Sequence, residues 1–244
     1  MSIYQLDIYV KLIYCVLMNF ITKNLLSLRV KIKACEQKFH RRPDSISLLA
    51  VSKSQSIEKI QEAIASGQKS FGENYLQEAL PKIEALKDQQ MEWHFIGSIQ
   101  RNKTRKIAEH FDWVQSVTDQ QMAKRLNDQR PEHLPPLNIC LEINISHEQT
   151  KSGIDEEEAF ALAAFCETLP RLKLRGLMAI PAPKPTFDEQ RIEMRKLTAL
   201  FTKMIEKGFK LDTLSMGMSQ DWEAAIAEGA TMIRLGTAIF GVRN

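Results

Sequence analysis

The sequence predicts one closed barrel of eight β/α units, a TIM barrel, with an extra helix in front of it. Short β-rich runs alternate eight times with segments of helical periodicity. Three of the helical segments end on a glycine shortly before the next strand, at Gly67, Gly208 and Gly229. A length of 244 residues suits one such barrel, since these barrels commonly take about 250 residues. An open doubly wound sheet is the lesser alternative.

The extra helix is the first regular element. From Ile21 onward, apolar residues recur at steps of four and three, and Asn19 is available as the N-cap. The apolar stretch 8–21 has no basic start and no cleavage site, and it is too short to span a bilayer. We expect residues 1–17 to be a doubtful N-terminal extension, from an over-extended start or a loosely attached segment. Residues 18–244 then form a single barrel domain.

The eight expected strands are short, and each precedes a helical segment. Strands that are buried on both faces read as continuous apolar runs, as residues 48–51 and 139–141 do. The helical segments carry apolar residues on one side, which would cover the outer face of the sheet. The expected strands are residues 46–52, 70–73, 93–97, 113–117, 138–144, 174–180, 213–216 and 232–235.

Composition and charge indicate an ordinary globular protein without a specialised partner. Basic residues number 33 and acidic residues 30, so the net charge is only +3. The basic run 101–106 opens a helix and is interpreted as a solvated face, because no second basic stripe or stacking motif accompanies it. We therefore expect no nucleic-acid or membrane partner. Cysteines without C-x-x-C spacing are interpreted as reduced core thiols of a cytoplasmic protein, namely Cys15, Cys35, Cys140 and Cys166.

The histidines give no case for a metal site. His94 lies inside an expected strand and is interpreted as a core histidine, while the others fall in expected surface segments. Histidine pairs, cysteine pairs and carboxylate clusters at ligand spacing are not present in the sequence. We expect no bound metal.

The expected strand ends place a lysine at the mouth of the barrel, where loops build the sites of this fold. Lys53 follows an apolar strand. Burial disfavours the charged ammonium and favours the neutral amine, which is the form that attacks aldehydes and makes imines. Taken alone, the residue is more simply interpreted as a lysine that extends from a strand end to solvent.

Two later strand ends predict a phosphate site. Gly217-Met218-Ser219 and Gly236-Thr237 each stand where a strand gives way to a helix. Glycine permits close backbone approach, and a helix start supplies free N–H groups. Barrels of this type frequently bind phosphate at the loops after strands seven and eight. Together with Lys53 on the neighbouring first strand, these turns predict a site for a phosphorylated aldehyde.

Ordered motifs along the chain carry a family resemblance. They are residues 48–53, 71–75, 93–97, 151–153, 175–178, 217–219 and 234–241. In these motifs the chain resembles the pyridoxal phosphate homeostasis protein family, also called the proline synthase co-transcribed or YggS family. The resemblance covers nearly all of the chain after Met18. It implies a barrel similar to the N-terminal domain of alanine racemase, the type III fold of pyridoxal 5′-phosphate (PLP) proteins, with PLP as the cofactor.

The resemblance also implies roles for particular residues. Lys53 would form the imine, Asn74 would lie near the ring, and Arg234 would face the pyridine nitrogen. The phosphate would be bound in the two glycine turns, whose members are Gly217, Met218, Ser219, Gly236 and Thr237. The family typically has an acidic residue after Gly-Met-Ser, whereas Gln220 stands here and an aspartate follows it. That departure puts only the adjoining helix turn in doubt.

The expected function is cofactor handling more than catalysis. A fixed cation at the ring nitrogen disfavours pyridinium formation and weakens the ring as an electron sink. In alanine racemase a second acid/base comes from an additional domain, which we do not expect here, and Tyr75 is the only tyrosine near an expected strand end. We expect a monomeric, non-enzymatic carrier and buffer in intracellular PLP homeostasis, with PLP-dependent apoenzymes or vitamin B6-pathway enzymes as candidate partners. The alternative is a weak PLP-dependent amino-acid racemase that uses Lys53 and either Tyr75 or a water.

Overall fold

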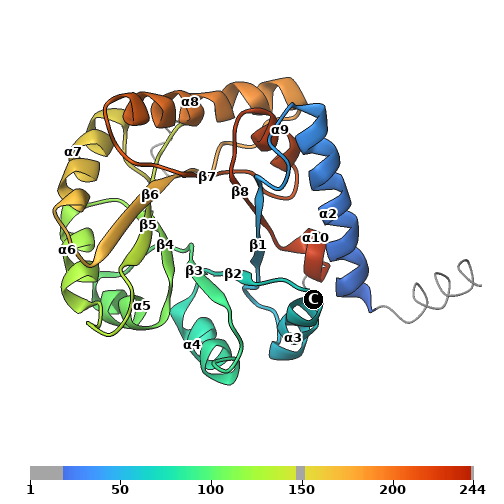
Figure 1. Cartoon of the computed structure of the whole chain (residues 1–244), viewed down its shortest axis with the longest axis horizontal. Helices are drawn as coiled ribbons and strands as arrows, with labels where there is room; N and C mark the ends of the chain where they lie inside the picture. Colours follow the sequence, from blue (N-terminus) through green and yellow to red (C-terminus); the bar gives the residue numbers. More distant parts are fainter. Residues whose placement is uncertain (1–18, 147–151, 243–244) are drawn as a thin grey trace, which may run out of the picture.

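The structure, a computed structural model, describes residues 19–146 and 152–242. The expectations for residues 1–17, Cys15 and His147 lie outside the described residues. Eight parallel strands close into a barrel in the order β1 to β8, and helices surround this ring (Figure 1). The predicted barrel is confirmed, and the open sheet is the wrong alternative.

The strands agree with their predicted ranges to within two residues at either end. Closure occurs where β1 pairs with β8, from Ser47 beside Met232 to Ala50 beside Leu235. The strands are β1 Ser47–Val51, β2 Ser70–Glu73, β3 Glu92–Phe95, β4 Trp113–Val117, β5 Leu137–Glu142, β6 Leu172–Met178, β7 Thr213–Ser215 and β8 Met232–Leu235.

The helices cover the outside of the barrel. Their bounds are α2 Phe20–Lys38, α3 Ile57–Ala65, α4 Leu76–Ala85, α5 Thr104–His110, α6 Gln120–Gln129, α7 Glu156–Glu167, α8 Phe187–Glu206, α9 Trp222–Ala227 and α10 Thr237–Phe240, with a 3₁₀ turn η1 at Arg101–Lys103. The glycines that end α3, α8 and α9 have φ of 81°, 101° and 103°, the left-handed conformation that glycine adopts without strain.

Helix α2 is the predicted extra helix. The Asn19 side chain accepts the N–H of Thr22 at 2.9 Å and so acts as the N-cap. The predicted apolar stripe is buried on one face of the helix, at Ile21, Leu25, Leu28, Ile32 and Cys35. This face packs against α3, α9 and α10, where the first and last units of the barrel meet (Figure 1).

Apolar side chains fill the space between strands and helices, but the inside of the barrel is partly polar. A separate small apolar cluster is made of Trp113, Cys140 and Met178. Polar side chains of four strands are also fully or almost fully buried, namely His94, Gln115, Ser215 and Arg234. Aliphatic residues dominate most such interiors, so this composition is unusual.

Two further expectations concern cysteines and membranes. Cys35, Cys140 and Cys166 are buried free thiols, and burial raises the pKa of Cys140 to about 12, which keeps it protonated. Among the residues that the structure describes, none of the helices combines the length and apolar character that crossing a bilayer requires.

Candidate functional site

A cavity of about 160 Å³ lies at the carboxyl ends of the strands and gathers most of the predicted site residues. Gly217 is the predicted site residue that does not line it. The lining residues are Val51, Lys53, Asn74, Ile96, Met178, Ile180, Met218, Ser219, Arg234, Gly236 and Thr237. The structure thus brings the first, second, seventh and eighth strand ends together around Lys53. Whether these residues bind a ligand stays a prediction.

Gly217 shapes the turn behind the cavity. Its φ is 95°, and a Cβ there would lie 2.6 Å from Cβ of Ala225. Glycine is therefore required by the backbone conformation and by the packing of α9 against the turn.

A buried polar cluster fixes the chain just before Lys53. Ser52 donates to Glu73 Oε1 at 2.6 Å, and Lys82 Nζ donates to the same oxygen at 2.8 Å and to the carbonyl of Ser52 at 2.9 Å. Burial raises the pKa of Glu73, while the bonds from Lys82 and Ser52 oppose that shift. The sequence reasoning missed Lys82; its position within the apolar stripe of α4 was the available signal.

The chain just after Lys53 is also held. Ser54 has φ of 59°, in the left-handed region that residues with a Cβ rarely occupy, and its N–H donates to Glu78 Oε2 of α4 at 2.9 Å. Lys53 itself is half-buried. Contacts on both sides therefore hold the backbone at Lys53 in a fixed position.

The turn after β7 borders the cavity through Met218 and Ser219. Asp221 Oδ1 accepts the N–H of Met218 at 2.5 Å and closes the turn. Within the described part of the chain, the N–H groups of Ser219 and Gln220 have no acceptor. The residue after Gly-Met-Ser is therefore not needed to close the turn, because Asp221 does so one position later. Free N–H groups at such a turn suit an anionic ligand.

The turn after β8 completes this side of the cavity. Helix α10 begins at Thr237, so the first amides of the helix have no acceptor within it. A Cβ on Gly236 would lie 3.1 Å from the carbonyl oxygen of Val51, so glycine allows β8 to end closely against β1.

Arg234 is a fixed cation in the wall of the cavity. Its Nη1 donates to the carbonyl and hydroxyl oxygens of Ser215 at 2.8 and 2.7 Å, and its Nη2 donates to the carbonyl of Ala179 at 2.9 Å. Burial lowers the pKa of Arg234 to about 10, against the opposing effect of Asp221 and Glu142. The guanidinium is therefore charged at neutral pH.

Asn74 separates this cavity from a larger one. Asn74 Oδ1 is buried and has no hydrogen-bond partner among the described residues. Its backbone is pressed against Gly97, where an added Cβ would lie 2.1 Å from the carbonyl oxygen of Asn74. Because Oδ1 has no partner among the described residues, it can accept a hydrogen bond from a donor group of a ligand.

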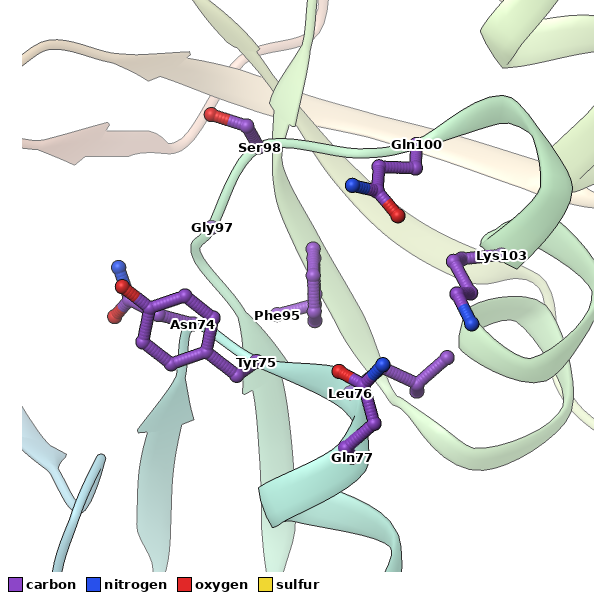
Figure 2. A pocket seen from close by; sticks show the side chains of 9 residues that line it. All are labelled: Asn74, Tyr75, Leu76, Gln77, Phe95, Gly97, Ser98, Gln100 and Lys103. Carbon is purple, nitrogen blue, oxygen red and sulfur yellow. The ribbon is translucent and has the colours of Figure 1, made fainter.

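The larger cavity measures about 290 Å³ and is shown in Figure 2. Tyr75 and Lys103 stand at its edges and Phe95 lies between them (Figure 2). Tyr75 lines this cavity and does not line the Lys53 cavity. Despite its size, the larger cavity contains neither Lys53 nor Arg234, so we take the Lys53 cavity as the candidate site.

Other sequence expectations concern His94, metals and the basic run. His94 is fully buried and its ring stacks on Trp113 at 5.1 Å, which confirms a core histidine. No cluster of His, Cys, Asp or Glu in the described residues is arranged to hold a metal. Arg101, Arg105 and Lys106 are exposed, as expected of a solvated face.

Fold and site together define a barrel of the alanine racemase N-terminal domain class, whose family model matches residues 24–244. Comparison with curated relatives identifies the family within this class. The chain is 50% identical over 230 residues to the pyridoxal phosphate homeostasis protein of Escherichia coli K12, covering 93% of this chain and 98% of that protein. It is also 50% identical over 227 residues to the protein of that name from Pseudomonas aeruginosa, covering 93% and 97%. The chain belongs to the pyridoxal phosphate homeostasis protein family.

Solved structures agree with this assignment. PipY of Synechococcus elongatus, in a structure with PLP bound, is 36% identical with a TM-score of 0.79, covering 91% of this chain and all of that one. Alanine racemase from Corynebacterium glutamicum is 20% identical with a TM-score of 0.65, covering 91% of this chain and 61% of that one. The second likeness concerns the fold alone.

Proposed function

We propose that this chain binds PLP through Lys53 and acts as a carrier and buffer in PLP homeostasis. The observation that carries the proposal is the single cavity that joins Lys53, the cation of Arg234 and the two glycine turns. The relatives named for pyridoxal phosphate homeostasis and the PipY structure with PLP bound support the choice of cofactor.

The residues of the cavity fit the chemical groups of PLP. The free amide of Ser219 and the start of α10 suit a phosphate dianion. The unpartnered Oδ1 of Asn74 suits a hydroxyl donor on the ring. Arg234 would stand at the ring nitrogen as a donor that cannot give up its proton at neutral pH.

The mechanism derives from these residues. Bound PLP supplies an aldehyde. Lys53 would provide the amine that holds this aldehyde as an imine with release of water, and addition of water would free the cofactor again. Ser52 and Ser54, held by Glu73 and Glu78, keep the lysine stem in place. Reversible attachment allows storage and handover.

The proposal includes the absence of substantial catalysis. Arg234 disfavours a protonated ring nitrogen, which lowers the capacity of the ring to withdraw electrons. Tyr75, the residue considered for a second acid/base, lines the neighbouring cavity and is 57% exposed. Incubation with single L-amino acids and chiral analysis tests this part. Turnover at an enzymatic rate that vanishes in Lys53→Ala would support the racemase alternative instead.

The attachment is tested by adding PLP to the purified protein, recording the absorption spectrum, reducing with borohydride and mapping the modified peptide. We expect the label on Lys53 and its loss in Lys53→Ala. Lys103→Ala is the matched control, since Lys103 belongs to the neighbouring cavity of the same rim. A label on any other lysine of the wild-type protein contradicts the proposal.

We also propose a cellular location for the protein and the kind of protein that receives the cofactor. A cytoplasmic location suits the reduced thiols, and the receiving proteins would be PLP-dependent apoenzymes or enzymes of the vitamin B6 pathway. Mixing the loaded protein with such an apoenzyme, and following activation of that enzyme, tests handover. Activation no faster than with an equal concentration of free PLP would count against a directed transfer.

A further inference from the structure

A row of hydrogen-bonded side chains crosses the inside of the barrel. Arg234 Nη1 donates to Ser215 Oγ at 2.7 Å, and Ser215 Oγ donates to Gln115 Oε1 at 2.7 Å. Gln115 Nε2 lies 2.9 Å from His94 Nδ1. We call these four residues the interior polar chain. In the closed strand order, β4 and β3 stand opposite β8 and β7, so the row joins opposite walls of the barrel (Figure 1).

The interior polar chain is almost completely removed from solvent. Ser215, Gln115 and His94 are 0% exposed and Arg234 is 4% exposed. Burying polar groups costs free energy unless they are paired, and aliphatic side chains would fill this interior at lower cost. Of the four, only Arg234 lines the Lys53 cavity. The other three therefore support that one residue.

The direction of the row is set by the Gln115 side chain, whose Oε1 faces Ser215 and whose Nε2 faces His94. Arginine donates and never accepts, so Ser215 Oγ accepts from Arg234 and gives its own hydrogen to Gln115 Oε1. The amide nitrogen of Gln115 then points at His94 and donates to Nδ1. His94 must be neutral with its proton on Nε2, which lies 3.6 Å from Glu92 Oε2.

The surroundings of His94 agree with a neutral ring. Complete burial lowers the pKa of His94, against smaller opposing effects from Glu92 and Asp112. Trp113 stacks on the ring with an interplanar angle of 10° and donates from its indole nitrogen to Glu92 Oε1 at 3.1 Å. The row thus runs from His94, whose Nε2 lies near the Glu92 carboxylate but beyond hydrogen-bond distance of it, to the guanidinium in the cavity wall.

We propose that Ser215, Gln115 and His94 are positioning residues, which hold the Arg234 guanidinium in one orientation toward the ring of the bound cofactor. The inference rests on the proposed function only for the identity of that ring. The row links Arg234 to side chains of three other strands, in addition to the backbone carbonyls of Ser215 and Ala179 that its guanidinium also contacts.

The first test uses the protein without cofactor. Nitrogen-15 NMR is expected to show His94 as the neutral Nε2–H form. In Gln115→Met the Arg234 side-chain resonance should move or broaden, since Ser215 loses its acceptor. In Gln115→Glu a carboxylate faces Nδ1, so His94 should gain a proton there. A wild-type proton on Nδ1, or an Arg234 resonance unchanged in Gln115→Met, overturns the proposal.

The second test uses added PLP. Gln115→Met is expected to weaken cofactor binding by about tenfold and to shift the absorption of the bound cofactor, because the Ser215 hydroxyl that accepts from Arg234 loses the acceptor that fixes it. Gln68→Leu is the matched control: the side-chain amide of this buried glutamine donates to the carbonyls of Leu48 and Ser70, away from the interior polar chain. The control should lose stability and keep the wild-type affinity and spectrum.

The outcomes separate the two proposals. Ser215→Ala removes the link between Arg234 and Gln115, so it serves the same test if Gln115→Met does not fold. A wild-type protein that binds no PLP contradicts the proposed function, while the NMR test still decides the positioning role. Wild-type affinity and spectrum in either folded variant overturn the positioning role while the proposed function stands.

Discussion

Gly97 has no side chain, and this allows the backbone of Asn74 to pack directly against it between the two cavities. A Cβ would lie 2.1 Å from the carbonyl oxygen of Asn74, which is backbone and cannot swing aside. We expect Gly97→Ala to destabilise the fold by about 2 kcal/mol, as overpacking does, and to weaken PLP binding by displacing Asn74. Denaturant unfolding and PLP titration measure both. Ser98→Ala is the neighbouring control, and equal stability of the two variants would refute the expectation.

Glu92 gives an expected pH dependence. Contact with His94, together with bonds from Trp113 and Ser70, lowers the pKa of Glu92 from 4.5 to about 2 in the folded protein. A lowered folded-state pKa contributes stability above pH 4.5 that is lost as the pH falls toward 2. The side chain is half-exposed, so the contribution is at most about 1 kcal/mol. Unfolding of Glu92→Gln should depend less on pH in this window, and an identical slope would contradict this.

At the scale of elements, Arg41 joins the end of α2 to the corner between α9 and β8. Its guanidinium donates to the carbonyls of Ile226, Gly229 and Ala230 at 2.7, 3.3 and 2.9 Å. Arg41→Met would leave carbonyls at this helix end unpaired and should cost about 2 kcal/mol in unfolding free energy. The exposed neighbour Arg42 is the control, and Arg42→Met should change stability by less than about 0.5 kcal/mol. Similar losses in both variants would disprove the role.

The strands and helices were the part of the structure that local sequence patterns predicted well. Strand runs, the α2 stripe and the glycine stops depend on neighbours within a few residues, which the sequence displays directly. The cluster of Ser52, Glu73 and Lys82 was not predicted. The cluster joins three segments of the chain. A lysine on a helix ordinarily faces solvent, so the position of Lys82 in the apolar stripe of α4 hints at burial but does not identify Ser52 and Glu73 as its partners.

At the scale of the molecule, cofactor binding should raise thermal stability. A ligand that binds only the folded state adds about 2.7 kcal/mol at a concentration of 100 times its Kd. For a chain of this size that corresponds to a Tm increase of roughly 5–10 °C. Scanning calorimetry with and without PLP measures the increase, and Lys53→Ala should lose most of it. A full increase in that variant would argue against attachment at Lys53.

The whole molecule is also expected to be a monomer. Exposed large apolar side chains in the described residues come from several elements, among them Val30 of α2, Ile192 of α8 and Tyr75 at the barrel rim. Sedimentation equilibrium should therefore give a mass near 28.0 kDa at micromolar concentration. A mass of twice this value would contradict the expected monomer.

Local sequence patterns were enough to predict the eight-unit barrel, the helix before it, and Lys53 and the glycine turns as candidate site residues. These follow from periodicity and from the rule that strand ends of a barrel share one rim. The surroundings of these residues depend on contacts between segments that lie far apart in the sequence. The bond between Ser215 and Gln115 spans 100 residues of sequence, and it exists because barrel closure brings their strands across a common interior. Pairings of that kind depend on strand register and on the three-dimensional direction of side chains, which no local pattern encodes.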